Sequence, residues 1–224
     1  MEKPKFADAA RAQHSILAPL EKKTLIWLAH RMPAWVNSDH LTVLGFLGMF
    51  LTGLAYWWAR WNKAGLLWAI VCLAVNWFGD SLDGTLARVR NKLRPRYGFY
   101  VDHVVDTFGA FFLLSGLALS GYMHWKIAMG LLIAFYGISI EVYLAAYTLG
   151  TFHLSHFKLG PTELRVLMCI GNVFLIYHPM AVVFGHRFQL FDVGGFFGIC
   201  GIGVMMLAAV FRNTRTLYRA EPIQ

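Results

Sequence analysis

Six long apolar runs constrain the fold of this 224-residue chain more than any other feature. They cover approximately residues 41–59, 64–82, 99–121, 126–148, 164–184 and 190–211. An α-helix needs about 20 predominantly apolar residues to cross the hydrocarbon core of a bilayer. Only 14% of the residues are charged, against about 25% in soluble domains. We therefore expect an all-α polytopic membrane protein with about six transmembrane helices.

Basic residues are distributed unequally between the segments that flank these runs. With the N-terminus inside, 16 of the 20 Lys and Arg residues fall in cytoplasmic segments and 4 fall outside. The positive-inside rule then predicts that both termini lie in the cytoplasm. The net charge of +8 is interpreted as this orientation signal plus attraction to anionic membrane lipids. No nucleic-acid motif accompanies it, so nucleic acid is not an expected partner.

The segment before the first run, residues 1–36, has a different pattern. Between residues 15 and 36 apolar and charged residues alternate as in an amphipathic helix, which predicts a helix in the membrane interface. The helix should end before Pro33, because the residue preceding a proline avoids the helical region. It is either an anchor or a flap over a cytoplasmic site. Residues 37–212 are expected to form the six-helix core of a single domain that covers residues 1–224.

Four aspartates, a third of the acidic residues, lie around the junction of the second and third runs: Asp80, Asp83, Asp102 and Asp106. The first two are spaced i, i+3 and the last two i, i+4, so each pair shares one helix face. Residues 89–97, with four basic residues and a proline, are expected to turn the chain between two antiparallel helices. The four carboxylates would then face each other near the cytoplasmic end of the membrane.

Four facing carboxylates near a membrane repel each other strongly unless a cation neutralises them. Oxygen ligands favour hard divalent ions such as Mg²⁺, Mn²⁺ or Ca²⁺. On the same face as Asp80, Gly84 and Ala87 leave the helix bare for a substrate. Arg88 can pair with a phosphate, and Asn76 lies one turn before the first aspartate. The pattern predicts a metal-dependent site for a phosphoanhydride.

Two other interpretations of the aspartates are open at this point. In one, Arg88, Arg90 and Arg96 neutralise them in a structural ion-pair network. In the other, the carboxylates belong to the pathway of a cation transporter. The position of the cluster at one end of the membrane and the scarcity of polar residues in the last two runs argue against transport.

The stretch from Asp80 to Asp106 reads D-x2-D-G-x2-A-R-x9-G-x3-D-x3-D, which resembles the signature of the CDP-alcohol phosphatidyltransferases. All eight specified positions are present. The family moves a substituted phosphate from a CDP-linked donor to an alcohol hydroxyl and releases CMP. The resemblance implies that Asp80, Asp83 and Asp102 bind metal, as two ions of Mg²⁺ or Mn²⁺. It also implies that Asp106 touches the metal site and acts as general base.

The resemblance extends to substrates and assembly. It implies that the CDP moiety is bound by Asp80, Asp83, Gly84, Ala87, Arg88 and Gly98, with Asn76 beside them. The reaction expected first transfers a phosphatidyl group from CDP-diacylglycerol to a small polar alcohol. The alternative transfers the headgroup of CDP-ethanolamine or CDP-choline to diacylglycerol. A homodimer is also implied.

The acceptor pocket is expected around "LGPTELR", which opens the fifth run. The Gly-Pro-Thr pattern alone predicts a helix start. In the functional interpretation, Glu163, Arg165 and Lys158 face the acceptor. Glu163 would suit an ammonium group, whereas the two basic residues would suit an acceptor with a phosphate, and both alternatives are open. Glu141, an acid inside the fourth run, either lines the same cavity or pairs with a donor on another helix.

Overall fold

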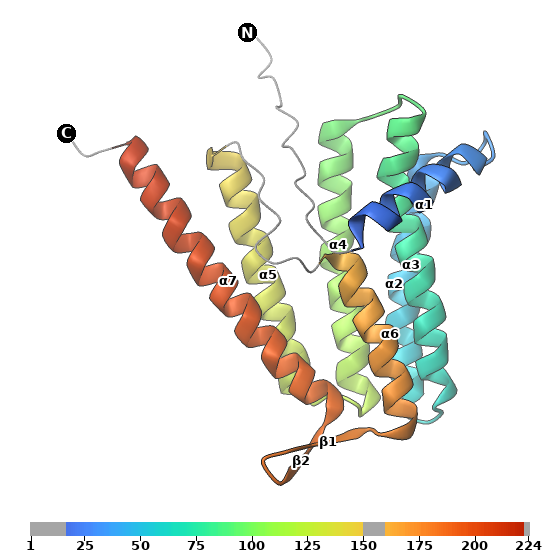
Figure 1. Ribbon diagram of the computed structural model, residues 1–224, viewed down its shortest axis with the longest axis vertical. Coiled ribbons are helices and arrows are strands. Elements are labelled where there is room, and N and C mark those ends of the chain that lie inside the picture. The colour runs from blue at the N-terminus through green and yellow to red at the C-terminus, as the bar shows by residue number, and fades with distance from the viewer. Residues whose placement is uncertain (1–16, 150–159, 222–224) are drawn as a thin grey trace.

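The computed structural model describes residues 17–149 and 160–221 of the chain. In these residues the elements are, in order, α1 (Ala18–Arg31), α2 (Ser38–Ala59), α3 (Ala64–Val89), α4 (Pro95–Ser120), α5 (Trp125–Leu149), α6 (Pro161–Tyr177), β1 (Met180–Val183), β2 (His186–Gln189) and α7 (Leu190–Ala220). Figure 1 shows α2 to α6 running along the long axis, α7 leaning outward beside α5, and α1 lying across the bundle. The expected all-α architecture is confirmed.

Five of these helices, α2, α3, α4, α5 and α7, are long and apolar enough to cross a membrane within the described ranges. The sixth, α6, has 17 residues and is therefore about 25 Å long, near the lower limit for a span. It packs along α3, as Figure 1 shows. The chain is therefore a multi-pass membrane protein.

The fifth apolar run is not one continuous helix, and the expected span over 164–184 is wrong at its end. The helix stops at Tyr177, since His178 precedes a proline and avoids the helical region. Residues 180–189 form an antiparallel hairpin instead. Its turn, Phe184 and Gly185, has positive φ at both positions (49° and 81°), as a tight hairpin turn requires.

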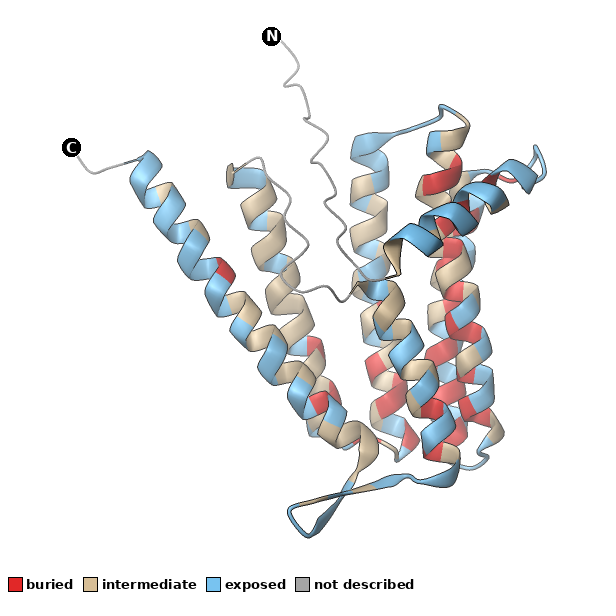
Figure 2. Cartoon of the chain, in the orientation of Figure 1, coloured by how far each residue is buried: buried red, intermediate tan, exposed pale blue. Residues whose placement is uncertain are grey.

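Close backbone contact fixes α2 against its two neighbours. A Cβ added to Gly79 of α3 would lie 2.5 Å from the carbonyl oxygen of Leu41 in α2, and one added to Gly53 of α2 would lie 2.9 Å from the carbonyl carbon of Phe112 in α4. Small residues at such crossings let membrane helices pack by dispersion forces. Buried residues accordingly concentrate in α2, α3 and the lower half of α4 in Figure 2, whereas α5 is mostly half-buried and α7 is mostly exposed.

The amphipathic segment forms α1, which ends at Arg31, before Pro33 as expected. Its buried residues Leu25 and Ala29 pack against Leu82 and Leu86 of α3. The other end of the bundle carries the hairpin, as Figure 1 shows. The helix therefore lies across α3 at the end of the bundle where the aspartates are found.

Candidate active site

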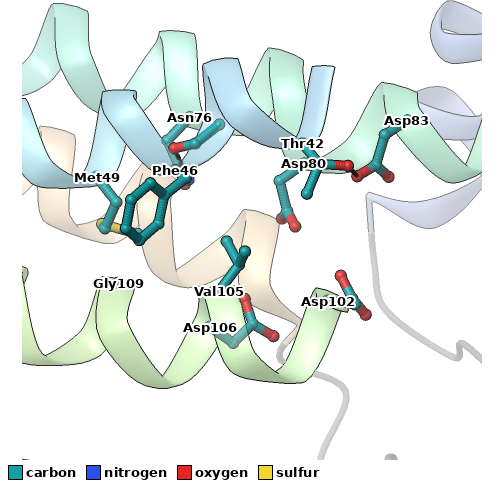
Figure 3. A pocket seen from close by; sticks show the side chains of 11 residues that line it. Thr42, Phe46, Met49, Asn76, Asp80, Asp83, Asp102, Val105, Asp106 and Gly109 are labelled. Atoms are coloured by element: carbon teal, nitrogen blue, oxygen red, sulfur yellow. Dashed lines mark hydrogen bonds between the residues drawn. The ribbon is translucent and has the colours of Figure 1, made fainter. Parts of the chain in front are cut away.

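The four aspartates line one pocket between α3 and α4. Asp80 and Asp83 belong to α3 and Asp102 and Asp106 to α4, and the pocket encloses about 350 Å³, its open mouth included. Figure 3 shows the α3 pair facing the α4 pair across this space. The helices are antiparallel because residues 90–94 form a short turn between them. The arrangement is the one that the i, i+3 and i, i+4 spacings predict.

Helix α2 provides a third wall of the pocket, which the sequence patterns did not predict. Thr42, Phe46 and Met49 line the pocket with Gly45. The hydroxyl of Thr42 donates a hydrogen bond to Asp83 Oδ2, with 2.6 Å between the oxygens. The spacing of Thr42, Phe46 and Met49 puts these three residues on one face of α2. Because this face carries no charge and lies within an apolar run, the sequence gives no sign that it belongs to a site.

Asp80 is held by an arginine from another helix. Arg165 of α6 donates from Nη2 to Asp80 Oδ2 at 2.5 Å and from Nε to Asn76 Oδ1 at 2.8 Å. The side chains of the ion pair are 13% and 25% exposed. Asn76 is buried and donates to the carbonyl oxygen of Gly45 in α2 at 2.9 Å. One polar network therefore connects α6, α3 and α2 at the wall of the pocket, which Gly45, Asn76 and Asp80 line.

Of the residues expected at the nucleotide, Asn76, Asp80 and Asp83 line the pocket, whereas Gly84, Ala87, Arg88 and Gly98 do not. A Cβ added to Gly84 would find only Nη2 of Arg88 nearby, at 3.8 Å, and one added to Gly98 would find nothing within 4 Å. Arg88 is exposed and Ala87 is half-buried. Both glycines therefore leave space beside the backbone of α3 and α4, and their use by a substrate stays a prediction.

The donor chemistry of the pocket fits a hard divalent cation, since it offers carboxylate and hydroxyl oxygens. Across residues 17–149 and 160–221, no three His, Cys, Asp or Glu side chains are gathered tightly enough to hold a metal ion as they stand. Asp80 instead contacts Arg165, and Asp83 contacts Thr42. The fit therefore rests on the oxygen donors and the shared pocket, not on a preformed cluster.

Of the residues expected in the acceptor pocket that the structure describes, Arg165 contacts one of the four aspartates, Asp80. Glu163 caps α6: its Oε2 accepts from the backbone N–H of Gly160 at 2.9 Å, and its Oε1 from that of Leu17 at 3.0 Å. Glu141 accepts from Asn213 Nδ2 of α7 at 2.7 Å, so it pairs with a donor on another helix. Lys158 lies outside the described residues.

Comparison with known proteins identifies the family of the chain. The sequence model of the family "CDP-alcohol phosphatidyltransferase" matches residues 35–211, well over half of the chain. An archaetidylinositol phosphate synthase from Pyrococcus horikoshii is 30% identical over 132 residues, which are 58% of this chain and 64% of the relative. The chain therefore spans slightly less than two thirds of that relative's length.

The family match covers α2 to α5, α6 and most of α7, and so includes all four aspartates. Its members generally depend on a divalent metal and join a CDP-alcohol substrate to an alcohol acceptor. Multi-pass helices, a pocket lined by carboxylates from two of them and the family match lead to one conclusion. The chain is a multi-pass membrane protein that belongs to the CDP-alcohol phosphatidyltransferase family.

Proposed function

We propose that this enzyme transfers a phosphatidyl group from CDP-diacylglycerol to a small polar alcohol that carries a phosphate, and releases CMP. The observation that carries the proposal is the pocket in which two aspartates of α3 face two of α4, with the guanidinium of Arg165 bound to Asp80. The carboxylates would bind metal, and the arginine would meet an anionic acceptor.

The proposed metal ligands are Asp80, Asp83, Asp102 and Asp106, and the proposed ions are two of Mg²⁺ or Mn²⁺. When bound, such ions neutralise the diphosphate and stabilise the departing CMP. Gly84, Ala87, Arg88 and Gly98, with Asn76, would position the CDP moiety, since the two glycines border open space and a guanidinium pairs well with phosphate.

Asp106 is the proposed general base. It lines the pocket and is exposed there, so an acceptor hydroxyl can reach it. The acceptor oxygen attacks the phosphorus that carries the diacylglycerol, and the proton of the hydroxyl passes to the carboxylate of Asp106. The bond between that phosphorus and the bridging oxygen breaks, and CMP leaves with this oxygen.

The preference for a phosphorylated acceptor rests on Arg165. Its Nε and Nη2 contact Asn76 and Asp80, and a guanidinium has five N–H donors in all, so it can also meet a phosphate. Both carboxylate oxygens of Glu163 accept backbone hydrogen bonds, which weakens the ammonium alternative. The name of the Pyrococcus relative also places an inositol phosphate in its product.

We further propose that the active site faces the cytoplasm, together with both ends of the chain, and that the enzyme is a homodimer. The turn between α3 and α4 and the β1–β2 hairpin lie at opposite ends of the bundle (Figure 1). A cysteine at Asn91 should therefore be labelled by an impermeant maleimide only in inside-out vesicles. A cysteine at Phe184, which is 98% exposed, should be labelled only in right-side-out vesicles. The reverse pattern would contradict the orientation.

The reaction is tested by CMP release from purified protein in lipid with CDP-diacylglycerol and Mg²⁺. The acceptor panel contains inositol phosphate, glycerol phosphate, inositol and serine, with CDP-ethanolamine or CDP-choline plus diacylglycerol as separate reactions. We expect release that needs a phosphorylated acceptor and is lost in Asp106→Asn. Release with serine or inositol alone would contradict the acceptor class, and release from a CDP-aminoalcohol would reverse the roles of the two substrates. No release from any donor by folded protein would favour the transporter.

A further inference from the structure

A single carboxylate oxygen joins three helices next to the pocket. Oε1 of Glu21, on α1, accepts hydrogen bonds from Trp77 Nε1 at 2.9 Å, Ser81 Oγ at 3.1 Å and Thr162 Oγ1 at 2.6 Å. The first two donors belong to α3 and the third to α6. Hydrogen bonds to a charged acceptor are roughly twice as strong as neutral ones, so this oxygen is a strong connection between α3 and α6.

The helix that carries Glu21 is fastened at both ends. At its start, the backbone N–H of Leu17 donates to Glu163 at the first turn of α6. Beyond its end, the guanidinium of Arg90 donates to the carbonyl oxygens of Met32 and Pro33 at 2.8 and 2.9 Å, and to that of Val36. With the apolar contacts to α3, these bonds make α1 a fixed brace across the bundle. The flap interpretation has no support in these contacts.

The brace acts on the same turns that hold the candidate catalytic groups. Ser81 follows Asp80 directly in α3, and Thr162 lies one turn before Arg165 in α6. The pair Asp80–Arg165 and the bridge through Glu21 therefore connect the same two helix turns at two points. Loss of the bridge would leave α6 attached to α3 at this level mainly through Arg165 itself.

We infer that Glu21 is a positioning residue: its carboxylate sets the register of α6 on α3 and so holds Arg165 where it orients Asp80 and meets the acceptor. This inference rests on the proposed function for the role of Arg165. Glu21 does not line the pocket, and it acts through its neighbours. The structural part, the fixed register of α6, holds whatever reaction the site performs.

Kinetics of matched variants test the positioning role. Glu21→Gln keeps an oxygen that can accept from all three donors but loses the charge, so the acceptor KM of this variant should lie between the values of wild type and Glu21→Ala. Glu21→Ala should raise the acceptor KM roughly tenfold, as expected for the loss of a hydrogen bond to a charged group, with a smaller change in kcat. Thr162→Val should act in the same direction, and Lys22→Ala, at an exposed neighbour, should change nothing.

A double-mutant cycle tests whether the effect passes through Arg165. In an Arg165→Gln background, Glu21→Ala should change the acceptor KM by less than about twofold, because coupled residues are not additive. If the fold-changes in acceptor KM from Glu21→Ala and Arg165→Gln multiplied in full in the double variant, the inference would be overturned. So would an unchanged KM in both Glu21→Ala and Thr162→Val, and so would a uniform loss of kcat in Glu21→Ala with no change in KM.

A distance measurement without turnover separates this inference from the proposed reaction. Spin labels are placed on α3 at Val71 and on α6 at Leu167, which are 50% and 61% exposed. The native cysteines Cys72, Cys169 and Cys200 are replaced by alanine. The distance distribution should broaden or shift in Glu21→Ala and stay narrow in Glu21→Gln and Lys22→Ala. An unchanged distribution in Glu21→Ala would refute the brace, whereas a changed one in protein that releases no CMP would refute the proposed reaction alone.

Discussion

Replacing Arg165 by methionine should destabilise the protein, and metal should reverse part of the loss. The change removes the charge and keeps most of the side-chain volume. It breaks the charged hydrogen bond to Asp80, worth about 2 kcal/mol, and leaves the oxygen of buried Asn76 without its donor, which costs about 1 kcal/mol more. Both partners are largely desolvated, at 13% and 25% exposure. We therefore expect a loss of about 3 kcal/mol in the free energy of unfolding.

The assay is reversible unfolding in mixed micelles, followed by circular dichroism with and without Mg²⁺. Because a divalent cation at the pocket would neutralise Asp80 in place of the guanidinium, saturating Mg²⁺ should recover about half of the loss in Arg165→Met. It should recover little in the double variant Arg165→Met, Asp80→Asn. The double variant should also be more stable than the sum of the single effects predicts. A loss below about 0.5 kcal/mol in Arg165→Met, or one that Mg²⁺ leaves unchanged, would refute this reasoning.

Three further variants test the packing, the nucleotide site and the base. Gly53→Ala should lower the free energy of unfolding by about 2 kcal/mol or more, because the added Cβ would clash with α4. Gly201→Ala, whose added Cβ would meet nothing within 4 Å, should change it by less than about 0.5 kcal/mol. Equal effects in the two variants would contradict the close crossing of α2 and α4. Gly84→Val should weaken binding of CDP with Mg²⁺, measured by calorimetry, at least about tenfold without lowering the melting temperature, and unchanged binding would remove the nucleotide from this face of α3. Asp106→Asn should lower kcat for CMP release at least about a hundredfold. The control is Asp192→Asn, since Asp192 accepts a hydrogen bond from the N–H of His124, and its kcat should stay near wild type. Similar kcat values in the two variants would exclude Asp106 as the base.

Helix periodicity within one segment was enough to predict the central part of the site. The spacing of the four aspartates and the short basic turn predict two facing carboxylate pairs, and the pocket between α3 and α4 has this arrangement. The six apolar runs predict six long helical segments, because the length of each run corresponds to the thickness of a bilayer. These features depend on local sequence alone.

Contacts between distant segments were beyond such reasoning. Thr42 and Phe46 line the pocket because small residues bring α2 against α3 and α4, and nothing in an apolar run says which of its faces meets which partner. Glu21 sits in a segment that reads as a surface amphipathic helix, yet its donors are 56, 60 and 141 residues away in sequence. The early end of α6, by contrast, has a local cause, the proline that follows His178, which hydropathy alone does not take into account.

Helix geometry separates the two charged residues at the start of α6, Glu163 and Arg165, and this bears on the proposed acceptor. Glu163 and Arg165 are separated by only one residue in the sequence. Two residues at this spacing on a helix nevertheless point about 200° from each other. Glu163 accordingly turns toward Gly160 and Leu17, and Arg165 turns toward Asp80 and Asn76. The two cannot both face one acceptor beside the aspartates. The residue of α6 that contacts Asp80 is therefore a guanidinium and not a carboxylate, which supports the proposal of an acceptor that carries a phosphate over one that carries an ammonium group.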